Sequence, residues 1–103
     1  MKPLFVTLLV AFSVNANAFA VFGSPDCGQW VKAQNATHRA WLLGYLSGMN
    51  AVWTKGQSAV GGPLDKLSSA QQAFVWMDNY CQKNPLKDVG DGATGLFLEL
   101  NER

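Results

Sequence analysis

The sequence has few of the residues from which catalytic and metal sites are built. Its only histidine is His38, and its two cysteines do not form a Cys-x-x-Cys pair. Structural zinc sites draw on clusters of cysteine and histidine, and serine or cysteine hydrolases need a base beside the nucleophile. We therefore predict no metal, no cofactor and no catalytic residues, and we interpret the chain as a non-enzyme.

Two short patterns resemble functional motifs but lack the context that those motifs need. Gly90 to Gly95 reads GDGATG, which matches the G-x-G-x-x-G of dinucleotide-binding proteins. That fingerprint follows a buried strand, whereas the residues here are preceded by Pro85 and flanking lysines. Asp88 and Asp91 could form a pair of carboxylates, but their spacing is equally that of a solvated helix face. Neither pattern predicts a site.

Long apolar runs are absent except at the N-terminus. Lys2 precedes an apolar run over residues 4–12, and small residues follow it. This order is typical of a secretory signal peptide, whereas a membrane-spanning helix needs about 20 apolar residues. We predict that residues 1–20 are a signal peptide, cleaved after Ala18 or Ala20, and that no membrane anchor remains.

Charge is scarce and balanced in the remaining residues 21–103. Of the 8 basic residues only Lys2 lies in the leader, which leaves 7 basic and 7 acidic residues. A net charge near zero provides no general attraction to nucleic acid or to an anionic membrane, so we predict neither as a partner. A chain this short forms one small domain that buries only about 60 to 65 per cent of its unfolded surface.

The two cysteines supply a means of stabilising so small a core. Cys27 and Cys81 are 54 positions apart, and an even number of cysteines in an exported small domain is typical of a disulfide. We predict an intramolecular bridge, which would stabilise the fold by about 4 kcal/mol in the chain-entropy model. An intermolecular bridge and a free reactive thiol are the alternatives.

Apolar periodicity predicts a first long helix over residues 37–54, after a short helical or turn segment that contains Trp30. Asn35 or Thr37 can cap this helix. One apolar stripe consists of Leu42, Leu46, Met49 and Trp53. A second stripe consists of the small residues Ala40, Gly44, Gly48 and Ala51. Because glycine inside a helix costs about 1 kcal/mol relative to alanine, we expect another helix to approach this second stripe closely.

Two further helices follow a loop. Ser68 and Gln71 form a capping box for one of them, whose inward residues are Ala70, Ala73, Phe74, Met77, Tyr80 and Cys81. Asn84 and Pro85 are predicted to start the last helix, whose apolar face is Leu86, Val89, Ala93, Leu96, Phe97 and Leu100. The glycines at 90, 92 and 95 should weaken this helix or break it in two. The fold class is therefore all-α, a small disulfide-stapled bundle of about four helices.

The glycine-rich loop over residues 54–67 is the candidate binding surface, because an exposed loop can enter a cleft and an adjacent aromatic side chain can anchor it. The candidate partner-binding residues are Trp53, Lys55, Gln57, Ser58, Val60 and Leu64. The competing interpretation is that the loop is an ordinary connector. Trp30 and Trp41 are expected in the core.

Three segments in this order resemble the Rap/Tai family of small exported immunity proteins: CGQW, WLLGYLSGMN and VWMDNYCQKNPLKDV. The resemblance covers about residues 25–101. The matching positions are Cys27, Gly44, Tyr45, Gly48, Trp76, Tyr80, Cys81, Asn84, Pro85 and Leu86. All of them are framework residues, so no inhibitory residue is carried over. The glycines at 90, 92 and 95 depart from the alanine-rich final helix of the family.

The resemblance implies a periplasmic protein of a Gram-negative bacterium that binds and blocks a peptidoglycan amidase toxin delivered by type VI secretion. It also implies an all-α, disulfide-stapled fold related in class to the acid-stress chaperone HdeA, and a homodimer as one form of the protein. Two alternatives remain open. One is an HdeA-like chaperone that acid unfolds, and the other is an exported accessory domain of unknown activity.

Overall fold

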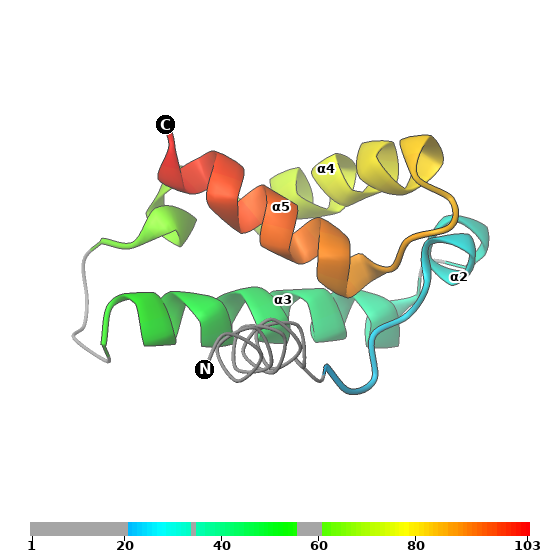
Figure 1. The fold of residues 1–103 in the computed structure, drawn as a ribbon, viewed down its shortest axis with the longest axis horizontal. Coiled ribbons are helices and arrows are strands. Elements are labelled where there is room, and N and C mark those ends of the chain that lie inside the picture. Colours follow the sequence, from blue (N-terminus) through cyan, green and yellow to red (C-terminus); the bar gives the residue numbers. More distant parts are fainter. Residues whose placement is uncertain (1–20, 34, 56–60) are drawn as a thin grey trace, which may run out of the picture.

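The computed structural model describes residues 21–33, 35–55 and 61–103, and it shows a small all-α fold (Figure 1). The described residues form four α-helices and one 3-10 turn, with no strand beyond an isolated bridge between Asp26 and Asp88. The elements are α2 (Cys27–Lys32), α3 (Ala36–Trp53), η1 (Pro63–Lys66), α4 (Ala70–Lys83) and α5 (Val89–Asn101). The predicted fold class and helix number are confirmed.

Helix α5 is the centre of the arrangement. It packs against α3, α4 and η1, while α2 packs against α4. Figure 1 shows α5 running obliquely between the long α3 and the shorter α4, with α2 at one end. The core residues are Cys27, Trp30, Leu42, Leu46, Ala73, Phe74, Met77, Cys81, Val89, Ala93, Leu96, Phe97 and Leu100.

A disulfide and a buried tryptophan hold α2 on α4. Cys27 and Cys81 are bonded, with their Cα atoms 4.9 Å apart, so the predicted intramolecular bridge is confirmed. Trp30 is fully buried, as expected, and its indole Nε1 donates to Asp78 Oδ1 at 2.8 Å. The six-residue α2 would be unstable alone. These two contacts, together with the capping box between Asp26 and Gln29, fix it in place.

Helix α3 begins and ends within one residue of its predicted bounds. The side chain of Asn35 caps it by accepting from the His38 main-chain N–H at 2.9 Å. Leu42 and Leu46 are buried, which confirms the main stripe. The expected close approach along the small-residue stripe is not found among the described residues, where a Cβ at Gly44 or Gly48 would meet no atom within 4 Å. Helix α5 and η1 pack on α3 elsewhere, for example where Trp53 meets Phe97 and where the Leu64 N–H donates to Asn50 Oδ1.

Helix α4 starts one residue later than the capping-box pattern predicts. Ser69 occupies the N-cap position and its side chain makes no capping hydrogen bond. The pair formed instead is the Ser68 main-chain N–H donating to Gln72 Oε1 at 2.7 Å. The expected inward residues Ala73, Phe74, Met77 and Cys81 are buried and Tyr80 is half-buried, but Ala70 is exposed.

Helix α5 starts at Val89 and not at Pro85, and Leu86 is 98% exposed instead of buried. The cause is a contact with the distant N-terminal segment. The Cys27 main-chain N–H donates to the Lys87 carbonyl, and the Val89 N–H donates to the Pro25 carbonyl, both at 2.9 Å. The Lys87 N–H closes a turn by donating to the Asn84 carbonyl at 3.0 Å, and Asp88, which is extended, caps α5 by accepting from the Asp91 N–H at 2.8 Å.

The GDGATG segment lies inside α5, and its glycines do not break the helix. Gly90 and Gly92 are buried on opposite sides, where neighbouring elements approach the backbone. A Cβ at Gly92 would lie 2.6 Å from Met77 Sδ and 2.8 Å from Tyr80 Cδ2 on α4. The Gly90 N–H donates to Ser24 Oγ at 2.9 Å. These glycines therefore let α5 fit between its neighbours.

Candidate functional site

An apolar groove of about 950 Å³ lies between α3 and α5. It is lined by Gly44, Tyr45, Gly48, Met49, Val52, Trp53, Thr94, Phe97 and Leu98. None of these side chains is charged, and only Tyr45, Trp53 and Thr94 carry a polar group. Binding of a partner to such a surface is favourable mainly because it removes apolar area from water.

Three large apolar side chains at the groove are exposed. Val52 is 79% exposed, and Trp53 and Leu98 are each 52% exposed. Isolated exposed apolar residues are ordinary in soluble proteins, but residues gathered around one concave surface mark an interaction site. Val52 and Trp53 end α3, whereas Leu98 lies on α5, so packing of the two helices brings them together.

Trp53 is held in position before any partner binds. Its ring packs edge-on against the buried ring of Phe97, with centroids 5.7 Å apart and planes at 71°. An aromatic side chain that is already ordered loses little conformational entropy on binding. Trp53 therefore has the properties of a preorganised anchor.

The backbone of α3 forms the wall beneath these side chains. Gly44 and Gly48 are one turn apart on α3, are exposed, and have open space where a Cβ would be. A neighbouring segment can therefore reach the helix backbone itself. Next to them the Tyr45 ring stacks on Trp41 at 4.9 Å with an interplanar angle of 13°, which limits its movement.

The structure places three of the six predicted partner-binding residues. Trp53 lies at the groove, and Lys55 is exposed just after α3, with a φ of 58° that is typical of a residue ending a helix. Leu64 lies in η1, packs partly against the core, and donates its main-chain N–H to Asn50 Oδ1 at 3.2 Å. Gln57, Ser58 and Val60 lie outside the described residues.

Most of the groove is not predicted from the sequence, namely Val52, Leu98 and the open faces of Gly44 and Gly48. A signal was present, since Val52 and Leu98 are apolar residues that lie off the buried stripe of their own helices. Residues of this kind are common enough that the sequence alone did not mark these two out. Only the packing of α3 on α5 shows that they share one surface.

The titratable groups Asp88 and Tyr80 have structural explanations. Asp88 is the N-cap of α5, and with Asp91 it lies about half-buried to exposed at the surface. Burial, followed by the nearby charges of Asp91 and Asp88, raises the pKa of the Tyr80 phenol. On α3, His38 Nδ1 is buried and has no hydrogen-bond partner among the described residues. Across residues 21–33, 35–55 and 61–103, no group of three potential metal ligands occurs.

Comparison of the chain with protein-family models, curated proteins and solved structures gives no match. In the part of the chain that the structure describes, no helix combines the length and the apolar character needed to cross a membrane.

Proposed function

We propose that this chain is a periplasmic immunity-type protein that binds and inhibits a peptidoglycan amidase toxin delivered by type VI secretion. The observation that carries the proposal is the uncharged groove between α3 and α5, with the exposed side chains of Val52, Trp53 and Leu98 at its edge. The resemblance of three sequence segments to the Rap/Tai family supports the choice of partner.

Binding through this groove follows the pattern of an ordinary protein interface. A tryptophan anchor that is ordered in the free protein supplies a large share of the binding free energy, and the surrounding apolar groups exclude water. Gly44 and Gly48 allow a segment of the toxin to lie directly against the α3 backbone. Inhibition then results from blocking access to the catalytic cleft, which requires no catalytic group on this chain.

The test begins with the full chain, expressed with its own N-terminal segment in a Gram-negative host. Recovery of the oxidised protein from the periplasm, followed by N-terminal sequencing, checks export and the cleavage position. The purified protein is then titrated against a panel of type VI amidase effectors, with peptidoglycan hydrolysis as the readout. We expect tight binding to a member of the panel, with loss of its hydrolytic activity.

Variants of the groove test the surface separately from the partner. Trp53→Ala should weaken binding by about 30-fold, the effect of losing about 2 kcal/mol at an anchor. Val52→Glu carries a charge into the groove from a 79% exposed position, where it should not disturb folding. The matched control is Leu86→Ala, because Leu86 is a 98% exposed apolar residue outside the groove.

Two results would overturn the proposal. If no effector in the panel is bound, the assigned function is wrong. If an effector is inhibited equally well by the Val52→Glu and Leu86→Ala variants, the function stands but the groove is not the surface that carries it.

A further inference from the structure

A small polar pocket of about 360 Å³ lies where the N-terminal segment meets the start of α5. It is lined by Val21, Tyr45, Asp88, Gly90, Asp91 and Thr94. Asp88 and Asp91 carry the only charged side chains of this lining, so the pocket has two negative charges and no positive one. Its charge is therefore complementary to a cation.

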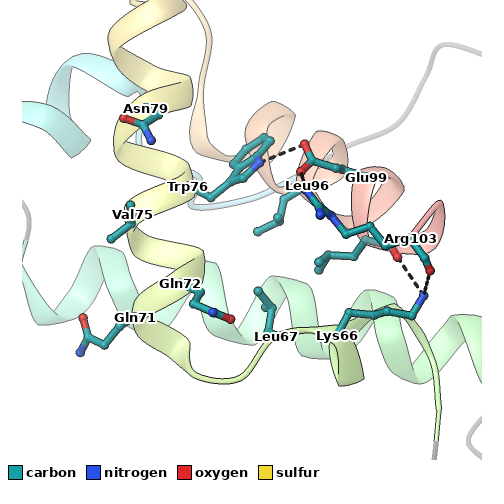
Figure 2. Close-up of a pocket in the computed structure, with 11 residues that line it drawn as sticks. Lys66, Leu67, Gln71, Gln72, Val75, Trp76, Asn79, Leu96, Glu99 and Arg103 are labelled. Atoms are coloured by element: carbon teal, nitrogen blue, oxygen red, sulfur yellow. Dashed lines mark hydrogen bonds and ion pairs between the residues drawn. The ribbon is translucent and has the colours of Figure 1, made fainter.

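The two carboxylates at the start of α5 have no basic side chain beside them. Neither Asp88 nor Asp91 forms a salt bridge with any residue in the described chain. The other end of α5 differs, since there Glu99 is paired with Arg103 at 2.8 Å and accepts from the Trp76 indole N–H at 3.2 Å (Figure 2). The positive end of a helix dipole amounts to only about half a charge. The start of α5 therefore keeps an excess of negative charge.

A third carboxylate adds to this excess. Asp26, the N-cap of α2, lies opposite Asp88 in the isolated antiparallel bridge. Their main chains are not bonded to each other, and in pairs of this kind the side chains come closest. Like charges directly opposite one another are unfavourable, and a cation nearby relieves the repulsion. The neighbouring Lys87 is exposed and lines no part of the pocket.

The N-terminal segment is fixed beside this pocket by hydrogen bonds to two helices. The Phe22 carbonyl accepts from the Trp41 indole N–H on α3 at 3.0 Å. Ser24 Oγ accepts from the Gly90 N–H on α5 at 2.9 Å. Val21 is the residue immediately before these contacts, and it lines the pocket itself. The main chain at Val21 is therefore held at the pocket.

The sequence places a cleavage point directly before this residue. Residues 1–20 lie outside the described residues, and Ala18-Phe19-Ala20 is one of the two small-residue motifs at which the predicted signal peptide ends. Hydrolysis of the peptide bond between Ala20 and Val21 adds water across it. The products are a carboxylate on Ala20 and, after proton transfer, an ammonium group on Val21. Cleavage after Ala18 leaves the ammonium group on Phe19 instead.

We propose that the leader is removed after Ala20 and that the α-ammonium group of Val21 then forms an ion pair with Asp88 and Asp91. This ion pair fastens the N-terminus of the processed protein to the start of α5. The proposal rests on export and processing of the chain, and binding of an amidase plays no part in it or in its test.

The first experiment determines the N-terminus of the processed protein. The full chain is expressed in a Gram-negative host, and the oxidised protein is recovered from the periplasm and sequenced from its N-terminus. We expect Val-Phe-Gly-Ser-Pro. A protein that begins at Phe19, or that keeps residues 1–20, overturns the proposal.

The second experiment measures the pKa of the new α-amino group. The ¹³Cα chemical shift of Val21 is followed as a function of pH in the isotope-labelled, processed protein. The reference is the peptide VFGSP, residues 21–25, amidated at its C-terminus. Because nearby carboxylates favour the charged form, we expect the pKa of Val21 to be higher in the protein than in the peptide. Equal pKa values overturn the proposal.

Two substitutions that remove charge test the carboxylates. Asp91→Asn should raise the acid dissociation constant of the Val21 ammonium about threefold, as expected for a partly exposed ion pair. Asp88→Asn should act in the same direction and preserve the helix cap, because asparagine is as good an N-cap as aspartate. The matched control is Glu102→Gln, an exposed carboxylate at the other end of α5, which should have no effect. If neither aspartate variant changes the constant, the ion pair is absent.

The pH dependence of unfolding gives an independent readout. A folded pKa above the unfolded value means that the stability is present below the unfolded pKa and is lost as the pH rises through the folded pKa. The advantage of the parent over Asp91→Asn should therefore shrink between pH 7 and pH 9.5. Tyr80 does not contribute in this range, because burial, then Asp91 and Asp88, raises its pKa. Tyr45, which also lines the pocket, is common to both proteins. A constant difference overturns the proposal.

Discussion

Helices α3 and α5 each carry glycines in their interior, but the two sets have opposite surroundings. Gly92 on α5 is buried, and a Cβ there would overlap Met77 and Tyr80 of α4. Gly44 and Gly48 on α3 are exposed, and a Cβ at either position would meet nothing. Both sets weaken their helix by similar amounts, about 1 kcal/mol for each glycine. Within the described chain, only the α5 set has a packing reason that offsets this cost.

The comparison shows that the structural role of a glycine pattern in a helix depends on which atoms pack against it. On α3 the pattern Gly-x-x-x-Gly indicated a helix–helix contact, and on α5 the pattern GDGATG indicated a weakened helix. Among the described residues the close contact is made at Gly92 of α5, whose helix is unbroken, whereas α3 presents an open surface. An open glycine pair beside exposed apolar side chains is consistent with a partner outside this chain, as in the proposed function.

The largest effect is expected for Gly92→Ala, which should destabilise the fold by about 1 to 3 kcal/mol through overpacking. Met77 is fully buried and has little room to move away from the new methyl group. Denaturant unfolding measures the change. In a Met77→Ala background the same substitution should cost less, because the clash with Met77 is gone and only that with Tyr80 remains. An equal cost in both backgrounds would mean that the close approach is not what requires glycine.

Gly44→Ala and Gly48→Ala should have the opposite sign and a smaller size. Each is expected to stabilise the isolated protein by about 1 kcal/mol, because alanine favours the helix and the added methyl group meets open space. Both should also weaken binding of the proposed partner, by denying it the α3 backbone. Thermal and denaturant unfolding test the first effect, and titration with the bound effector tests the second. If either alanine variant destabilised the free protein, the glycines of α3 would not differ from Gly92 of α5 in the way described.

Gly95→Ala allows two glycines of the same helix, Gly95 and Gly92, to be compared. A Cβ at Gly95 would lie 3.5 Å from Trp76 Cη2, an ordinary contact that requires no movement. We therefore expect stabilisation of somewhat less than about 1 kcal/mol from helix propensity, in contrast to the loss at Gly92. Parallel unfolding curves of the two variants provide the measurement. A loss of similar size at both positions would mean that the whole contact of α5 with α4 is too tight for a methyl group.

The smallest effect tests whether polar contacts also hold α5 on α4. Hydrogen bonds from Arg103 and Trp76 lower the pKa of Glu99, so its carboxylate stabilises the fold above the unfolded pKa. This contribution disappears as the pH falls through the lowered folded pKa. Since Glu99 is 42% exposed in its ion pair, we expect Glu99→Gln to cost only about 0.5 kcal/mol near neutral pH. Unfolding of both proteins from pH 7 to pH 2 should show this difference shrinking to zero.

The sequence was sufficient for two features that depend on local information. The periodicity of Leu42 and Leu46, with Asn35 before them, predicted α3 to within one residue. The i, i+4 spacing of Glu99 and Arg103 likewise matches an ion pair of 2.8 Å. Both features depend on residues within a few turns of one another.

The sequence failed where distant segments decide the local structure. Leu86 fits the apolar period of α5, but hydrogen bonds of Lys87 and Val89 to the segment of Pro25 and Cys27 accompany a helix that starts only at Val89. Leu86 is left in solvent. The groove between α3 and α5 was missed for the same reason. Val52 and Leu98 belong to one surface only after the two helices have packed. Neither result can be read from periodicity within one helix.

The attachment of the N-terminal segment also has a consequence for folding. Cys27 must find a partner 54 positions later, and Ser24 accepts from Gly90 across 66 positions. A chain made from its N-terminus therefore exposes residues 24–27 long before their partners have been synthesised. Helices α3 and α4 rely on local contacts and can form early, whereas ordering α2 must wait for loop closure. We expect nearly the whole chain to emerge before native structure becomes stable, so the ribosome releases it in a largely unfolded form.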